Sequence, residues 1–166
     1  NILQMFYLPP LASTEVGKQL LGMASMFASK RAAKHFWGYL KGQRYRLQSD
    51  GKGKDVTRKA LQDAYGFDTK YAMHMVRLGY QGVEFLKEGK LTFPLPDEQL
   101  TYLKALRNGS VTLQDALERT RALEADIEGL LVSSKLPAQP ERSKVERWML
   151  DIYWSAWDEI RGGDLI

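Results

Sequence analysis

KYAMHMVRLGYQGVEFL, residues 70–86, is the stretch that decides the fold of this chain. Wound as an α-helix at about 100° per residue, it places five polar side chains within one narrow arc, while nearly all other positions are apolar or glycine. An ordinary surface helix shows the reverse, an apolar stripe and a broad polar face. The stretch therefore predicts a mostly buried helix with one polar seam, formed by Lys70, His74, Arg77, Gln81 and Glu84.

A polar seam on a buried helix must be satisfied by internal pairing or must open onto a cleft. Lys70 and Arg77 suit phosphate oxygens, and an arginine can bind them through two parallel hydrogen bonds. His74 lies between them and adds a further donor. Two interpretations stay open from the residues alone. The seam lines a cleft for an anionic ligand, or it is an internal salt-bridge seam in which Glu84 pairs with Arg77 or with a neighbouring helix.

The composition is that of a folded globular protein. The chain has 166 residues, of which 44% are hydrophobic and 27% charged, enough for one domain with a real core or at most two small ones. Because cysteine is absent, disulfides and thiolate metal sites are excluded. The sequence shows no signal peptide and no apolar run of about 18 residues. We therefore expect a cytoplasmic protein with no membrane partner.

Charge is distributed unevenly along the chain. Residues 1–66 hold 11 Lys/Arg against 4 Asp/Glu, and residues 67–166 hold 13 against 16, which together give the net charge of +4. A basic part joined to a mildly acidic one indicates a localised surface for anions. Lysines that cluster by chance on a solvated surface would give the same pattern.

Periodicity and capping residues predict an all-α fold with six or seven helices and almost no strand. The residue before a proline avoids the α region, so a short helix end at residues 1–7 should stop before Pro9. Later helices should follow caps at Ser13 or Thr14, Ser29, Asp55, Asp68, Asp97 and Thr112. The expected ranges are 14–27, 30–47, 56–65, 69–88, 98–107 and 113–131, with a final helix over 141–161.

The predicted helix at 30–47 mixes cations with aromatic side chains. Such mixtures bind phosphates and stack on bases, although long cationic side chains also lie along the apolar surface of core helices. We favour contact with nucleic acid. The candidate residues are Lys34, Lys41, Arg44 and Arg46, and the loop at 49–54 adds further exposed lysines.

A proline-bearing linker at 133–140 separates the helical domain, residues 1–140, from a tryptophan-rich helix in 141–166. Trp148, Trp154 and Trp157 stand among acidic residues, which favours packing on the domain or on a protein partner over base stacking. Removing 141–166 should then abolish binding of that partner while leaving the seam intact.

Signatures of hydrolytic or metal chemistry are absent from the sequence. The two histidines, His35 and His74, do not stand in an HExxH or similar ligand spacing. The sequence contains no GxSxG and no Asp-x-Asp pair, and therefore no evident carboxylate pair for a two-metal centre. We place no catalytic and no metal-binding residue in this chain.

Six strings along the chain nevertheless resemble one family in the right order. KYAMHMVRL, residues 70–78, resembles its "KHxxHxxRL" motif, and residues 1–10 resemble "NPxxLExLxxP". FASK at 27–30 with FWGY at 36–39 and Gln43 resembles "FLSK…FxGYAxxQ". EFLKEG at 84–89 resembles "ExLxxGE", LRNG at 106–109 resembles "IRxGE", and SKLP at 134–137 resembles "SxLP". Over residues 1–160 the chain thus resembles nucleotidyltransferases of the DNA polymerase β superfamily, a bacterial and phage group linked to RNA repair.

The resemblance implies a fold in two parts. The family has an N-terminal αβ part, whose Gly-Ser motif and carboxylates hold Mg²⁺ and the nucleoside triphosphate (NTP), and a helical part. This sequence resembles only the helical part. It begins in an apolar pattern without Met, so we expect the catalytic part upstream of Asn1 or on a separate chain. We do not expect activity from this chain alone.

By resemblance, Lys70, His74, Arg77 and Arg107 are the positions that face the nucleotide. The match departs from the family at Tyr71, where His is frequent, and at Ser110, where Glu is usual. The implied function is transfer of a nucleotide from an NTP to an RNA, DNA or other hydroxyl acceptor, with this part binding phosphate or acceptor. The alternative is a non-catalytic module that binds nucleic acid or protein.

Overall fold

The computed structural model describes residues 2–48 and 56–163. This part of the chain holds helices and no strand, as the sequence predicts. In chain order the helices are α1 (Ile2–Met5), α2 (Glu15–Gly22), α3 (Ala24–Phe27), α4 (Lys30–Gln48), α5 (Val56–Tyr65), α6 (Thr69–Glu88), α7 (Asp97–Arg107), α8 (Leu113–Ser133) and α9 (Arg142–Gly163).

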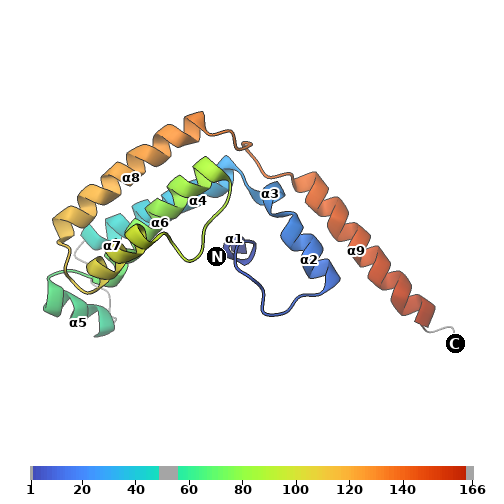
Figure 1. Ribbon diagram of the computed structural model, residues 1–166, viewed down its shortest axis with the longest axis horizontal. Coiled ribbons are helices and arrows are strands. Elements are labelled where there is room, and N and C mark those ends of the chain that lie inside the picture. Colours follow the sequence, from blue (N-terminus) through green and yellow to red (C-terminus); the bar gives the residue numbers. More distant parts are fainter. Residues whose placement is uncertain (1, 49–55, 164–166) are drawn as a thin grey trace.

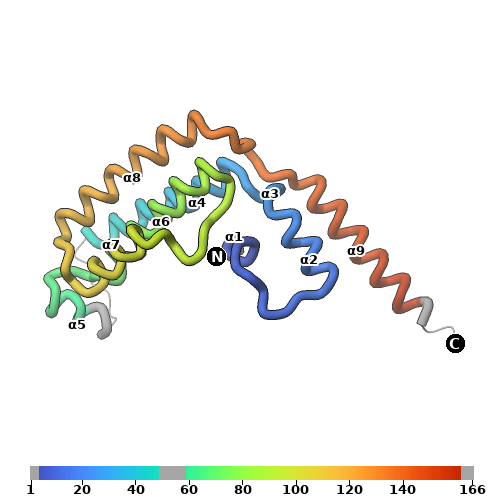
Figure 2. Tube along the Cα trace, viewed as in Figure 1, coloured from blue at the N-terminus to red at the C-terminus, as the bar shows by residue number. Residues whose placement is uncertain are grey.

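Three long helices form the body of the molecule. α6 lies between α4 and α8, and α7 packs on α6 (Figure 1). α8 continues through residues 134–141 into α9, which turns away from this body and runs beside α2 and α3 (Figure 2). The sequence thus predicts correctly that residues 70–86 form the central helix.

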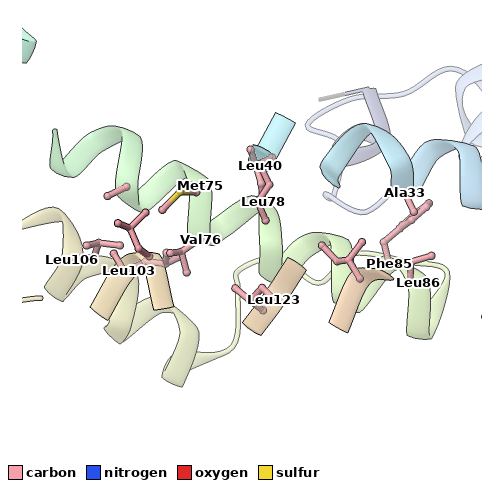
Figure 3. Close-up of a cluster of buried hydrophobic side chains, with 14 of the residues drawn as sticks. Ala33, Leu40, Met75, Val76, Leu78, Phe85, Leu86, Leu103, Leu106 and Leu123 are labelled. Carbon is pink, nitrogen blue, oxygen red and sulfur yellow. The ribbon is translucent and has the colours of Figure 1, made fainter. Parts of the chain in front are cut away.

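The hydrophobic core surrounds α6. Its buried side chains include Met75, Val76, Leu78, Phe85 and Leu86, which meet Leu40 of α4, Leu123 of α8 and residues of α7 (Figure 3). Burial of ten of the 20 residues of α6 explains why its sequence shows no broad polar face. The helix is stabilised mainly by this packing.

Capping side chains set several helix starts where the sequence places them. Asp68 accepts hydrogen bonds from the backbone N–H groups of Lys70 and Tyr71, both at 3.0 Å. Thr14 and Thr112 cap α2 and α8, and the Ser29 hydroxyl accepts from the Ala32 N–H at the start of α4. The expected cap at Asp55 and the loop at 49–54 lie outside the described residues.

Two boundaries differ from the sequence prediction in kind, while the ends of α4, α8 and α9 shift by only one or two residues. The helix expected over 14–27 is divided at Met23, whose N–H bonds to the carbonyls of Leu20 and Leu21 and closes α2 beside Gly22. The expected cap Asp97 is instead the first residue of α7, and Pro96 occupies the cap position without a side-chain hydrogen bond. A proline is compatible with this place because an N-cap residue has extended backbone, and Pro96, at φ −50° and ψ 143°, adopts it.

Candidate functional site: a cavity between α4 and α6

Three of the five seam residues of α6, His74, Arg77 and Gln81, line a cavity of about 420 Å³ between α4 and α6. Both helices contribute polar and apolar side chains to its wall. Gln4 of α1 and Leu91, which follows α6, complete it. The lining residues are Gln4, Ala32, His35, Phe36, Tyr39, His74, Arg77, Leu78, Gln81 and Leu91.

The N-terminal segment is held over this region by long-range contacts. The Tyr7 hydroxyl donates to the carbonyl oxygen of Gly89 at 3.0 Å, and the Phe6 ring lies 4.9 Å from that of Phe27. These contacts tie the chain around Gln4 to the end of α6 and to α3. Gln4 is therefore part of the site although it is 70 residues from His74 in sequence.

Arg77 and His74 form a hydrogen-bonded pair at the cavity wall. The Arg77 Nη2 lies 2.8 Å from the His74 Nδ1. Because a guanidinium only donates, Nδ1 must accept, and the imidazole is neutral with its proton on Nε2. Burial and the positive charge of Arg77 lower the pKa of His74 below its ordinary value. Nε2–H remains available to a ligand.

No carboxylate balances the charge of Arg77 within the described part of the chain. Its Nε is buried without a hydrogen-bond partner, and Glu84 forms no ion pair there with Arg77 or any other described residue. A buried or partly buried arginine is normally paired. The internal salt-bridge seam, the alternative that the sequence left open, is thus not formed among these residues.

Gln81 is a second polar group without a partner at this wall. Its side chain lines the cavity, is only 3% exposed, and makes no hydrogen bond with a described residue. A buried amide normally forms hydrogen bonds. Arg77, His74 and Gln81 therefore line one cavity, to which the His74 Nε2–H and the Gln81 amide offer donors that no described residue uses, while the Arg77 Nε lies buried behind them.

The other two residues expected to face the nucleotide lie at the N-terminal end of α6. Lys70 is exposed and does not line the cavity. Arg107, at the end of α7, donates from Nη1 to the Thr69 hydroxyl at 3.1 Å. The fold brings His74 and Arg77 together and leaves Lys70 and Arg107 near the start of α6.

The four cations of α4 that the sequence suggested for nucleic-acid binding divide between two sides of the helix. Arg44 pairs with Glu124 of α8 at 2.9 Å. Lys41 lies 3.8 Å from Glu128 and 3.6 Å from the centre of the Trp37 ring. Both cations therefore face α8, which limits what they offer to nucleic acid.

Lys34 and Arg46 line a second hollow of about 350 Å³ along α4. His35 and Tyr39 line this hollow and the cavity, so the two spaces are neighbours. The sequence did not point to Gln4 and His35 as site residues, and it suggested Tyr39 only as one of the aromatic side chains mixed with the cations of this helix. The i, i+4 spacing of His35 and Tyr39 places both side chains on one face of the helix, which can be read from the sequence. Gln4 joins them only through tertiary contacts.

The described residues contain no group of three or more His, Asp or Glu side chains placed to hold a metal ion. The Mg²⁺ that the family resemblance implies therefore has no ligand group among the described residues, and it stays a prediction. Among the described helices none is both long and apolar enough to cross a bilayer.

The chain was compared with models of protein families, with curated proteins and with solved structures, and none of the three comparisons gives a match. The resemblance to nucleotidyltransferases therefore rests on the strings quoted from the sequence and stays a prediction.

Proposed function

We propose that this chain is the helical part of a nucleotidyltransferase and that the cavity between α4 and α6 binds the phosphate groups of its nucleotide. In this proposal the reaction transfers a nucleotide from an NTP to a hydroxyl acceptor, with RNA as the favoured acceptor. Mg²⁺ and the carboxylates that hold it belong to a part outside these 166 residues. This chain positions the phosphates and is inactive alone.

The observation that carries the proposal is the unpaired Arg77. A partly buried guanidinium, bonded to a neutral imidazole and facing a cavity with no Asp or Glu in its described lining, is stabilised most simply by an anionic ligand. A phosphate offers several acceptor oxygens for the free donors of Arg77, His74 and Gln81. The Phe36 and Tyr39 side chains on the other side suit a planar base or sugar.

The role of these residues in the reaction would be electrostatic. Charge that develops on transferring phosphoryl oxygens is stabilised by donors already in place, and a ligand held by several donors is oriented for in-line attack. The His74 Nε2–H and the part of the Arg77 guanidinium that lines the cavity supply such donors without any rearrangement of α6.

Substitution of Arg77 tests this function directly. Arg77→Met keeps most of the side-chain volume and removes the charge, so the Kd of ATP and of inorganic tripolyphosphate should rise at least tenfold, as expected when a charged hydrogen bond of about 1.5–3 kcal/mol is removed. Isothermal titration calorimetry measures both ligands. Arg121→Met removes an exposed arginine of α8 and should leave both Kd values unchanged. Equal affinities for the two variants would contradict the proposal.

A second candidate function, binding of single-stranded nucleic acid along α4, is favoured by the hollow that Lys34 and Arg46 line beside the cavity. Removing one cation that binds a phosphate should reduce the salt dependence of log K by about 0.7 for a single strand. The double variant Lys34→Gln, Arg46→Gln should therefore bind a fluorescent RNA oligonucleotide more weakly and with a slope smaller by about 1.4.

The matched control is Lys41→Gln, which changes a cation that faces Glu128 of α8. It should affect RNA binding far less, as fluorescence anisotropy at several salt concentrations would show. If Lys41→Gln has the larger effect, the RNA does not follow this hollow.

A further inference from the structure

Gln81 offers the cavity an acceptor as well as donors. A glutamine amide carries one carbonyl oxygen, Oε1, and one NH2 group, Nε2. The side chain is only 3% exposed and forms no hydrogen bond with a described residue. Polar atoms that are shut off from solvent without a partner include the Arg77 Nε and the Gln43 Oε1, but neither amide atom of Gln81. The amide of this buried residue therefore reaches the cavity that it lines.

A phosphate alone would leave the carbonyl oxygen of this amide without a partner. An ionised phosphate only accepts hydrogen bonds, so it can bind the Nε2 donors but not Oε1. Gln4, the other amide at the cavity, is partly exposed, so solvent can serve it. Because a buried acceptor without a donor costs free energy, the ligand that fits Gln81 carries a hydrogen-bond donor close to its phosphates.

The place of Gln81 on α6 indicates which donor this is. His74, Arg77 and Gln81 follow at i, i+3 and i+7 on one face of the helix. Gln81 lies one turn, about 6 Å of helix rise, beyond Arg77. In a nucleotide a single CH2 group joins the sugar to its 5′-phosphate, whereas the amino groups of the base lie on the far side of the sugar. The donors nearest to a phosphate beside Arg77 are therefore the sugar hydroxyls.

We propose that Gln81 recognises the ribose of the bound nucleotide, with a sugar hydroxyl donating to Oε1 and Nε2 donating to an oxygen of the same ligand. The inference rests on the proposed function, because it takes the phosphates to lie beside Arg77 and His74. It adds the substrate class, a nucleotide with an intact ribose in preference to a deoxynucleotide. A buried group that loses its hydrogen-bond partner disfavours the analogue that lacks the hydroxyl.

Calorimetry with ATP, 2′-deoxy-ATP and 3′-deoxy-ATP tests this role. At least one deoxynucleotide should bind the wild-type chain about three- to tenfold more weakly than ATP, the effect of one neutral hydrogen bond. Gln81→Met removes the amide and should abolish the difference, whereas Gln114→Met, at an exposed glutamine of α8, should preserve it. Each variant is measured with all three nucleotides, so a loss of folded protein does not change the ratio of their Kd values.

Gln81→Glu separates recognition of the hydroxyl from a structural role. A carboxylate still accepts from a hydroxyl but no longer donates, so the preference for ATP should remain while every phosphate ligand binds more weakly. A merely structural role of Gln81 would not preserve the preference in this variant and abolish it in Gln81→Met.

Equal Kd values for ATP and both deoxynucleotides in the wild type would overturn the inference, as would a preference that survives in Gln81→Met. If tripolyphosphate still binds through Arg77 in either case, the proposed function stands without the ribose contact. If neither tripolyphosphate nor ATP binds the wild-type chain, the proposed function and this inference are both wrong.

Discussion

The central chemical feature of the molecule is the short distance between a charged and a neutral group, Arg77 and His74. Arg77 uses one donor on the imidazole, and its Nε remains without a partner. The imidazole cannot take up a proton on Nδ1 without losing that hydrogen bond. An anion in the cavity favours positive charge on both side chains and therefore favours protonation of His74.

Binding of an anion to the cavity should therefore take up protons. The pKa of His74 is lowered in the ligand-free protein and should rise when the anion arrives, so affinity should increase as the pH falls through the range around 6.5 and below. Sulfate is a suitable probe because its charge is constant over this range. The association constant should rise by up to about tenfold for each pH unit of acidification, as measured by calorimetry.

His74→Gln should flatten this pH dependence. His35→Gln is the matched control, because His35 also lines the cavity but accepts no hydrogen bond from Arg77. If the dependence disappears only in His35→Gln, the proton is taken up at His35 and the assignment to His74 is wrong.

The same lowered pKa has a consequence for stability. Because the unfolded state binds the proton more readily than the folded state, His74 contributes stability that is complete above about pH 6.5 and declines as the pH falls through the lower folded pKa. Acid should thus destabilise the free protein and strengthen anion binding at the same histidine.

At the scale of elements, two glycines allow α6 to lie close to its neighbours. A Cβ at Gly79 would come 2.7 Å from the Leu123 Cδ1 and 3.1 Å from the Leu40 Cδ1. One at Gly82 would come 2.9 Å from the Ile127 Cδ1. Gly82 also lies close to α4, because its added Cβ would come 3.3 Å from the Cβ of Phe36, a residue that lines the cavity.

Gly79→Ala should destabilise the protein although alanine is the better helix former. The gain in helix propensity is about 1 kcal/mol, whereas overpacking a core costs about 1–3 kcal/mol, so we expect a net loss on the order of 1 kcal/mol. Gly129→Ala lies mid-helix on α8 with no atom within 4 Å of the added Cβ, and it should stabilise by about 0.5–1 kcal/mol. The urea denaturation midpoint should fall for Gly79→Ala and rise for Gly129→Ala. If both variants are stabilised, the close packing of Gly79 against Leu123 and Leu40 is wrong.

Local signals predicted the elements well where a single side chain decides the start of a helix. Asp68, Thr14, Ser29 and Thr112 act on N–H groups two or three residues away, and such short-range chemistry is visible in the sequence. The break at Met23 was not predicted, because the periodicity of residues 14–27 is compatible with a continuous helix. α3 packs on α9, which is far along the chain. The periodicity of residues 14–27 carries no information about this contact.

At the scale of the whole molecule, α4 and α8 are joined by ion pairs across about 80 residues of sequence. Arg44 and Glu124 are the more enclosed pair, with side chains 29% and 12% exposed. Lys41 and Glu128 are more exposed and 3.8 Å apart. Two cations expected to bind nucleic acid, Arg44 and Lys41, thus each lie beside an acidic side chain of α8, and of the two only Arg44 is in an enclosed pair.

Glu124→Gln should lower the free energy of unfolding by about 1–3 kcal/mol, because it leaves a partly buried guanidinium without its carboxylate. Glu128→Gln removes an exposed pair and should cost less than about 1 kcal/mol. Chemical denaturation of both variants measures the difference. Equal effects would show that Arg44 finds another partner in solution.

The sequence by itself determined the all-α class, the central place of residues 69–88 and the phase of the seam. These three features depend on the helical period and on burial, and both can be inferred from whether each residue of the stretch is polar or apolar. Tertiary structure alone decided which seam residues meet a cavity and which stay outside. Gln4, His35 and Tyr39 join His74 and Arg77 because separate helices pack together, whereas Lys70 and Arg107 lie elsewhere. A helical period specifies a direction around one axis, and only packing specifies what lies in that direction.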